Sequence, residues 1–311
     1  MESLQSPQSH RPMIQRELAA TFRRLHQKGG PILVLPNAWD AMSARVIEQA
    51  EASAIATTSA GISWSLGRPD GHGLNRDEMV DVIRRIAAAV RLPVSADIEG
   101  GYGSGTPEDV YQTVRQVIAA GAVGVNLEDG TGRNNEPLHD PAYQAERIGA
   151  ARMAGDAEGV DLFINARVDS YLVEVGEPER RLEETLRRAA GYVAAGADGI
   201  FVPGVIDQPT IRLLARDIVA PLNVMAKPGA PGIAELSGLG VARVSVGPAL
   251  ACSVMALIGH AAGELIRLGT WAPLQGGMSY SEADGLFSAT RRGPGENRPA
   301  PGPAGPFHNP E

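Results

Sequence analysis

The chain has 311 residues, 43% of them hydrophobic, and a formal net charge of −8 at pH 7. This length and apolar content suffice for one large α/β domain, and the acidic balance argues against nucleic acid as a partner, because such binders usually carry clustered positive charge. The single cysteine, Cys252, excludes an internal disulfide and fits a reducing compartment. We expect no stretch apolar enough to span a membrane and no signal peptide in residues 1–11, which predicts a soluble cytoplasmic protein.

The two ends of the chain are predicted to be disordered. Residues 293–311 contain six prolines and four glycines, a composition that neither sustains a helix nor buries enough apolar area to offset the entropy of ordering. Residues 1–11 are polar and are assigned to a disordered N-terminus. The folded part is therefore expected to span residues 12–292.

Short runs of apolar or β-branched residues recur along the chain and are predicted to be strands. Eight such runs cover residues 32–35, 54–58, 93–97, 123–127, 162–166, 199–202, 222–226 and 242–246. Segments with apolar residues near the helical period of 3.6 separate them, for example 76–90, 107–120 and 177–195.

The helical segments carry start and stop signals. Thr106 followed by Pro107 is typical of a helix start, and Gly121 and Gly196 are typical of helix ends that lead directly into a buried strand. Repeated strand–helix units predict a parallel sheet, and eight of them predict a closed (β/α)8 TIM barrel, here with a C-terminal helical extension. A doubly wound open sheet is the alternative.

Polar residues follow several of the predicted strands, at the rim where barrel enzymes build their sites. Asp97 and Glu99 end the third strand, Glu128 the fourth, Arg167 the fifth and Lys227 the seventh. Each acid taken alone more commonly caps a helix or pairs with an arginine. Together, carboxylates on neighbouring strands repel one another unless a cation intervenes, and Mg²⁺ suits such oxygen ligands. Arg167 would then face an anionic ligand, since guanidinium suits a carboxylate.

Four separated motifs resemble the strand ends of the isocitrate lyase/phosphoenolpyruvate mutase superfamily. They are TTSAGISWSLGRPDG, PVSADIEGGYG, GAVGVNLEDG and FINARVDSY, at residues 57–71, 93–103, 121–130 and 163–171. The resemblance extends over roughly residues 15–270. It implies a barrel enzyme that binds a small carboxylate substrate, and a homo-oligomer, either a dimer or a tetramer, whose last helices, around residues 249–269, exchange between subunits.

The resemblance also assigns site residues. Asp97 matches the acid that ligates Mg²⁺ directly, while Asp70, Glu99 and Glu128 match acids that hold the ion through water, and Mn²⁺ could replace it. Arg167 matches the residue that grips a substrate carboxylate. The backbone that cradles substrate oxygens corresponds to Thr58, Ser59 and Ala60, with Gly61 beside them.

Two departures from the family pattern affect the expected chemistry. Glu99 stands where the family usually has an aspartate, and residues 129–141 lack both the Lys-Arg-Cys-Gly-His loop of the lyases and the Lys-Thr-Asn-Ser segment of the mutases. Tyr102 and His139 then become the candidates for proton delivery, and Arg133 the candidate for a second anionic group of the substrate. Substrate binding is also assigned to Lys227 and to Asn134 and Asn135, either of which could imitate the mutase asparagine.

We therefore expect a Mg²⁺-dependent carbon–carbon lyase or decarboxylase. Its substrate would be a small 2-oxo or 2-hydroxy (di)carboxylate, which would react through a pyruvate-type enolate. Residues 129–141 would form a mobile lid over it. Two alternatives stay open: a phosphonopyruvate/phosphoenolpyruvate-type mutase or another C–P bond enzyme, and a non-catalytic metabolite-binding barrel. The retained metal acids count against the last of these.

Overall fold

A computed structural model describes residues 7–71 and 73–288. The chain divides into two compact units, residues 1–275 and 276–311. In the second unit, the described residues contain one helix, α11 (Tyr280–Ser288).

The structure describes only part of the two ends that are predicted to be disordered. The tail at 293–311 lies outside the described residues, as do residues 1–6. Helix α1 begins at Pro7, so the helical part of the chain starts before the boundary expected at residue 12.

The described residues contain nine strands, all parallel, in a single sheet with the order β1-β9-β8-β7-β6-β5-β4-β3-β2. They are β1 (Leu33–Leu35), β2 (Asn37–Ala38), β3 (Ile55–Thr57), β4 (Val94–Asp97), β5 (Gly124–Glu128), β6 (Phe163–Arg167), β7 (Gly199–Val202), β8 (Leu222–Met225) and β9 (Arg243–Ser245). Each predicted run overlaps one of them, with β5 and β6 ending one residue later than predicted, and the additional strand β2 follows the first run after Pro36.

Pro36 divides the first strand of the barrel into two short pieces. Because proline has no N–H group, it cannot donate to a neighbouring strand. On one side of it β1 pairs with β9, and on the other β2 pairs with β3. The first and last strands are thereby joined, and the sheet closes as a (β/α)8 barrel. The predicted fold is confirmed, and the open doubly wound sheet is excluded.

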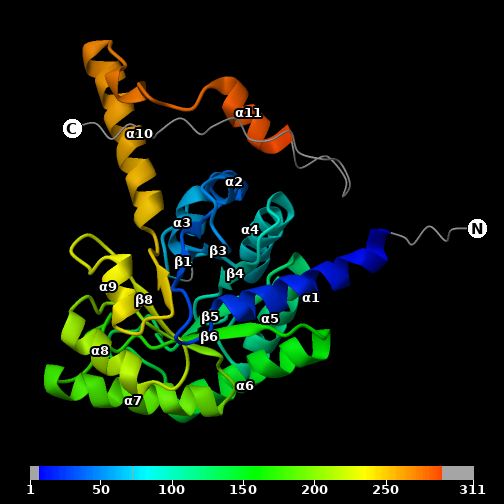
Figure 1. The fold of residues 1–311 in the computed structure, drawn as a ribbon, viewed down its shortest axis with the longest axis vertical. Coiled ribbons are helices and arrows are strands. Elements are labelled where there is room, and N and C mark those ends of the chain that lie inside the picture. The colour runs from blue at the N-terminus through cyan, green and yellow to red at the C-terminus, as the bar shows by residue number, and fades with distance from the viewer. Residues whose placement is uncertain (1–6, 72, 289–311) are drawn as a thin grey trace, which may run out of the picture. The chain divides into compact units, whose positions relative to one another are not determined.

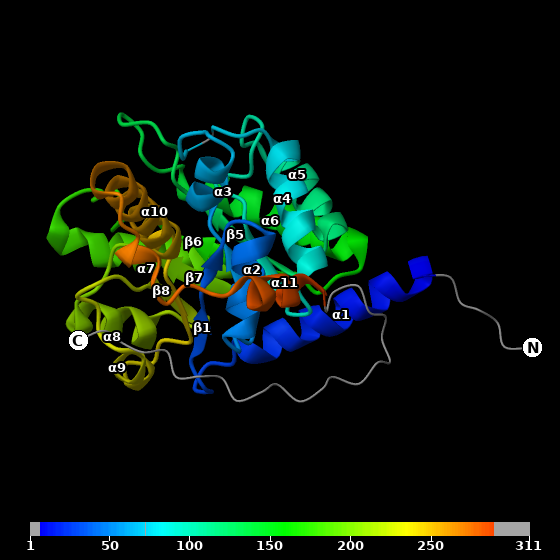
Figure 2. The same ribbon diagram turned by 90° about the horizontal axis from the view of Figure 1, so that it is seen from above.

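Helices alternate with the strands and surround them (Figures 1 and 2). In the first unit they are α1 (Pro7–Leu25), α2 (Ala41–Gln49), α3 (Ser59–Ser65), α4 (Arg76–Ala89), α5 (Pro107–Ala120), α6 (Pro141–Glu158), α7 (Pro178–Ala194), α8 (Gln208–Asp217), α9 (Ile233–Gly238), α10 (Ala249–Leu268) and the 3₁₀ turn η1 (Ala272–Leu274). The predicted helix signals operate as expected. Thr106 accepts a hydrogen bond from the Asp109 N–H at 3.2 Å at the start of α5, and Gly121 ends that helix with φ 111°.

Helix α1 closes the end of the barrel at which the strands begin. Phe22 is fully buried and meets the ring of Phe163, the first residue of β6, edge to face at 5.6 Å. A Cβ on Gly124, the first residue of β5, would lie 2.7 Å from the Phe22 ring. The absence of a side chain at position 124 therefore allows α1 to pack this closely against the sheet. With this end covered, the open rim is the one at which the strands end.

Helix α10 overturns one expectation from the sequence. It has 20 residues with a mean hydropathy of 1.6 and is long and apolar enough to cross a membrane, so the expectation of no such stretch was wrong. One such helix is weak support for a membrane span. Its exposed apolar side chains are Leu250, Val254, Met255, Leu257, Ile258, Leu265, Ile266 and Leu268.

The packing of α1 leads to a stability prediction. Replacing Phe22 by alanine should lower the free energy of unfolding by about 3 kcal/mol or more, because it leaves a cavity between α1 and the strand ends. Met13, on the same helix but 55% exposed, provides the matched control Met13→Ala. Urea unfolding followed by circular dichroism measures both variants. Equal, small losses would show that α1 does not close the barrel.

Candidate active site

Buried acidic side chains gather where β4 and β5 end. Asp97 is the last residue of β4, Glu99 follows two positions later, and Glu128 is the last residue of β5. Burial raises the pKa of Glu128 well above its usual range, and the charges of Asp169, Asp97 and Glu99 add to this effect while Arg167 opposes it. The structure therefore brings together three of the four acids that the sequence assigned to the metal.

Asp97 is held by the chain that follows β3. The Ser59 N–H and hydroxyl both donate to Asp97 Oδ2, at 3.2 and 3.0 Å, and the Asp97 N–H donates to Thr57 Oγ1 at 2.9 Å. The predicted substrate cradle, Thr58 to Gly61, is thus adjacent to the predicted metal acid. It forms the N-cap and first turn of α3.

Close packing fixes this first turn of α3. The cradle residues are buried, and a Cβ on Gly61 would lie 2.8 Å from both Thr58 Cγ2 and Trp39 Cβ. A side chain at position 61 would therefore displace the backbone that lies beside Asp97.

Glu99 and Tyr102 lie on a strained turn. Both have left-handed backbone conformations, with φ 48° and 58°, which non-glycine residues seldom adopt. The turn brings the Tyr102 hydroxyl to Glu99, and it donates to Oε1 at 3.2 Å. Burial and then the charges of Glu99, Asp97 and Glu128 raise the pKa of Tyr102 far above its usual value. The phenol therefore keeps its proton at neutral pH.

Arg167 lies beside the acid cluster and is paired with two carboxylates. Its Nη1 is 2.6 Å from Glu128 Oε2, while Nε and Nη2 donate to the two oxygens of Asp169 at 2.6 and 2.9 Å. These pairs, chiefly Glu128 and Asp169, raise the pKa of Arg167 against the effect of its burial. The predicted carboxylate-binding arginine thus lies at the rim, in contact with a predicted metal acid.

A network that sequence reasoning missed holds Asp169 in place. The Asp169 N–H donates to Asp129 Oδ1 at 2.9 Å, and the other oxygen of Asp129 accepts from Tyr192 at 2.6 Å and from Arg188 at 3.0 Å. Arg188 also donates to the His139 carbonyl at 2.9 Å, so α7 fixes both ends of the segment 129–139. The sequence signal was an arginine on the apolar face of a predicted helix.

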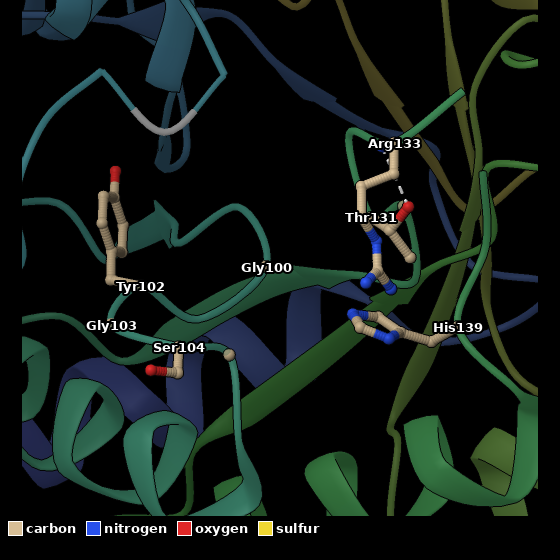
Figure 3. A pocket seen from close by; sticks show the side chains of 9 residues that line it. Gly100, Tyr102, Gly103, Ser104, Thr131, Arg133 and His139 are labelled. Carbon is tan, nitrogen blue, oxygen red and sulfur yellow. Dashed lines mark hydrogen bonds between the residues drawn. The ribbon is translucent and has the colours of Figure 1, made fainter. Parts of the chain in front are cut away.

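The segment 129–141 borders a pocket of about 280 Å³ (Figure 3). Tyr102 lines this pocket and also donates a hydrogen bond to Glu99 of the acid cluster. Its lining residues are Gly100, Tyr102, Gly103, Ser104, Gly105, Gly130, Thr131, Arg133 and His139. The guanidinium of Arg133 points toward the His139 ring in Figure 3 and is paired with Glu136 at 2.8 Å. Burial and the charges of Arg147 and Arg133 lower the pKa of His139 to about 4. At neutral pH His139 is therefore uncharged and holds no acidic proton to deliver.

The remaining predicted site residues lie on the surface. Asp70 is exposed on the loop after α3, Lys227 is exposed after β8, and Asn134 and Asn135 are exposed on the segment 129–141. Among the described residues, no group of three or more acidic, histidine or cysteine side chains is arranged so that it could hold one metal ion. The oxygen donors nevertheless fit Mg²⁺ in kind, and their burial side by side is unfavourable without positive charge. The set of four metal acids therefore stays a prediction.

Another buried arginine lies inside the barrel and was not predicted as part of the site. Arg243, from β9, is 1% exposed and donates to Asn126 Oδ1 at 3.2 Å. Asn126 is the register partner of Asp97. Burial lowers the pKa of Arg243 to about 9, and the charge of Asp97 opposes this only in part. Its sequence signal was a charged residue within an otherwise apolar strand.

Known enzymes with named activities resemble the chain at moderate identity. A 2-methylisocitrate lyase of Halalkalibacterium halodurans is 31% identical over 217 residues, 68% of this chain and 68% of that protein. An oxaloacetate decarboxylase of Bradyrhizobium sp. is 29% identical over 260 residues, 81% of this chain and 83% of that protein. These two relatives differ in the reaction that they catalyse, so the similarity alone does not select one.

Other matches are stronger and extend over most of the chain. An uncharacterized protein of Mycobacterium tuberculosis is 40% identical over 227 residues, 73% of this chain and 81% of that protein. A crystal structure from Burkholderia cenocepacia J2315, provisionally described as a lyase/mutase, is 38% identical with a TM-score of 0.82 and covers 89% of this chain and 97% of that chain. The family model of phosphoenolpyruvate phosphomutase matches residues 22–266. The chain therefore belongs to the phosphoenolpyruvate phosphomutase family, within the phosphoenolpyruvate mutase/isocitrate lyase superfamily.

Proposed function

We propose that this protein is a Mg²⁺-dependent carbon–carbon lyase or decarboxylase. Its substrate would be a small 2-oxo or 2-hydroxy (di)carboxylate that reacts through a pyruvate-type enolate. The observation that carries the proposal is the contact between Arg167 and the buried acids at the strand ends. One group there suits a substrate carboxylate, and the others suit a divalent cation.

The side chains divide the work of binding. Asp97, Glu99 and Glu128 would hold the cation, joined by Asp70 if its exposed loop moves inward. Bound Mg²⁺ would supply positive charge that stabilises an oxyanion next to the bond that breaks. Arg167 would orient the carboxylate of the substrate, and the buried first turn of α3 would keep Asp97 in place through Ser59.

Tyr102 is the better of the two candidates for proton delivery. His139 is neutral at pH 7 because burial and two arginines lower its pKa, so it carries no acidic proton there. Tyr102 retains its proton and directs its hydroxyl at Glu99, inside the acid cluster. A phenol that holds its proton this firmly can still protonate a strongly basic enolate carbon.

A C–P bond enzyme, such as a phosphonopyruvate mutase, is the second candidate. The pocket beside the cluster supports it, because Arg133 lines that pocket and could bind a phosphoryl group. Purified protein with Mg²⁺ should be assayed against oxaloacetate, malate and citrate homologues, and phosphonopyruvate. Pyruvate release from a carboxylate without phosphorus would support the lyase. Turnover of phosphonopyruvate alone would support the second candidate, and no turnover at all would favour a binding protein.

The metal assignment predicts the behaviour of Asp97→Asn. The variant should lose Mn²⁺ binding, and turnover should fall by about 100-fold or more, because one cation ligand is gone. The melting temperature should stay level or rise, since repulsion within the acid cluster is relieved. Asp81→Asn removes an exposed acid on α4 and is the control. Calorimetric Mn²⁺ titration and kinetics measure both, and full Mn²⁺-dependent activity in Asp97→Asn would refute the assignment.

The lid hypothesis concerns Arg133, which is exposed and lines the pocket. Arg133→Ala should lower kcat/KM by about tenfold, or roughly 1.4 kcal/mol, without changing Mn²⁺ affinity. Trypsin should cleave after Arg133 in the free protein, and Mg²⁺ with oxalate should protect the site. Arg216→Ala removes another exposed arginine of an ion pair and serves as control. Unchanged kinetics with cleavage that ignores ligand would place the segment outside the reaction.

We also propose that α10 packs against another copy of the chain. Its exposed apolar side chains would be covered there, as the superfamily resemblance implies. Ile258→Asp should shift the molar mass in light scattering toward the monomer, because it buries an unpaired charge in the contact. Val219→Asp alters an exposed apolar residue on the loop after α8 and should leave the mass unchanged. A monomeric wild-type protein would contradict this arrangement.

A further inference from the structure

Two carboxylates of the protein itself contact the Arg167 guanidinium. Nε and Nη2 donate to Asp169, and Nη1 contacts Glu128 at 2.6 Å. A planar guanidinium binds a carboxylate best through two parallel hydrogen bonds. A substrate carboxylate that binds in this way therefore competes with these two partners for the guanidinium.

Asp169 is the partner that stays. It binds Arg167 through both oxygens, and its side chain is 3% exposed. Its backbone N–H is fixed by Asp129, which Tyr192 and Arg188 hold in turn. A Cβ on Gly130 would lie 2.8 Å from Asp169 Oδ2, so the carboxylate is also packed closely against the chain on that side. Moving Asp169 would break several buried hydrogen bonds at once.

Glu128 is the partner that can leave. It contacts Arg167 through one oxygen, from the adjacent strand, and among the described residues no hydrogen-bond network like the one around Asp169 fixes its carboxylate. It is close enough to Asp97 and Glu99 to feel their charge. Glu128 therefore stands between two sources of positive charge: Arg167 on one side, and the cation expected among the acids on the other.

We propose that Glu128 covers the carboxylate-binding edge of Arg167 and uncovers it when a divalent cation draws Glu128 toward Asp97 and Glu99. This inference rests on the proposed function, because it takes Arg167 as the substrate's carboxylate site and the acids as the metal site. Cation binding then precedes productive carboxylate binding, and Asp169 acts as the positioning residue that keeps Arg167 aimed throughout.

The decisive experiment measures carboxylate binding without metal. Protein stripped of metal is titrated with oxalate in metal-free buffer by calorimetry, and Glu128→Gln is compared with wild type. Glu128→Gln should bind oxalate about tenfold more tightly, because the neutral amide competes weakly for the guanidinium. If oxalate bound only by chelating a metal ion, Glu128→Gln would gain no oxalate affinity here, since no metal is present.

Asp97→Asn is the matched control. It removes one negative charge from the same cluster without removing a contact to Arg167. Its metal-free oxalate affinity should rise clearly less than that of Glu128→Gln, because Asp97 makes no contact with the guanidinium that oxalate would occupy. An equal gain in Asp97→Asn would mean that general charge repulsion, not occupation of Arg167, limits binding. No gain in Glu128→Gln would refute the proposal directly.

Two further measurements keep the test independent of folding and of the reaction. If Glu128→Gln fails to melt cooperatively, Glu128→Asp replaces it, because its shorter side chain should retreat from Arg167 and also tighten oxalate. In the wild type, Mg²⁺ should strengthen the binding of propionate, which has no second oxygen function for chelation, and an unchanged propionate affinity would contradict the proposal. All of these experiments measure binding and none measures turnover. A wrong assignment of the reaction would therefore affect only the substrate assays and not this test.

Discussion

The pairing of Glu128 with Arg167 across β5 and β6 is the contact on which the rim of this barrel depends. The two residues are register partners at the ends of adjacent parallel strands. Either charge alone would be costly to bury, since an unpaired ion loses its hydration without compensation. Side by side, each makes the burial of the other tolerable. Arg167 thus opposes the rise that burial causes in the pKa of Glu128, and charge in this interior position acts on its neighbours with little screening by water.

Two further buried arginines lie near these groups. Arg188, from α7, donates to Asp129, which holds Asp169, and Arg243, from β9, donates to Asn126, the register partner of Asp97. Closure of the sheet is what allows segments so far apart in sequence to meet. The protein thus surrounds its acids with fixed cations, while Asp97, Glu99 and Glu128 still influence one another as like charges. In the proposed function, a divalent cation would reduce the repulsion among these three acids.

Much of this arrangement could be predicted from the sequence, for reasons that are local. A strand end is marked by the change from apolar to polar residues, which located Asp97, Glu128 and Arg167, and parallel strands put their ends on one rim. The partner of Arg188 and Tyr192 could not be predicted. Arg188 stands out as an arginine on the apolar face of a predicted helix, but Asp129 follows a strand that is distant in sequence, and nothing near the two residues identifies it as their partner.

Backbone geometry and the exposure of side chains could not be predicted from the sequence either. The division of the first strand depends on which neighbours lie on each side of Pro36, which only the closed sheet defines. The apolar character of α10 is legible in the sequence, but its exposure is not, and exposure is what separates a core helix from one that needs a partner. The backbone conformation of the turn at Glu99 and Tyr102 was also not evident from the sequence. Its left-handed residues cost about 1–3 kcal/mol each, and the turn that they form places the Tyr102 hydroxyl against Glu99. In the proposed reaction this fixed hydroxyl would be the proton source, because the segment 129–141 carries no thiol.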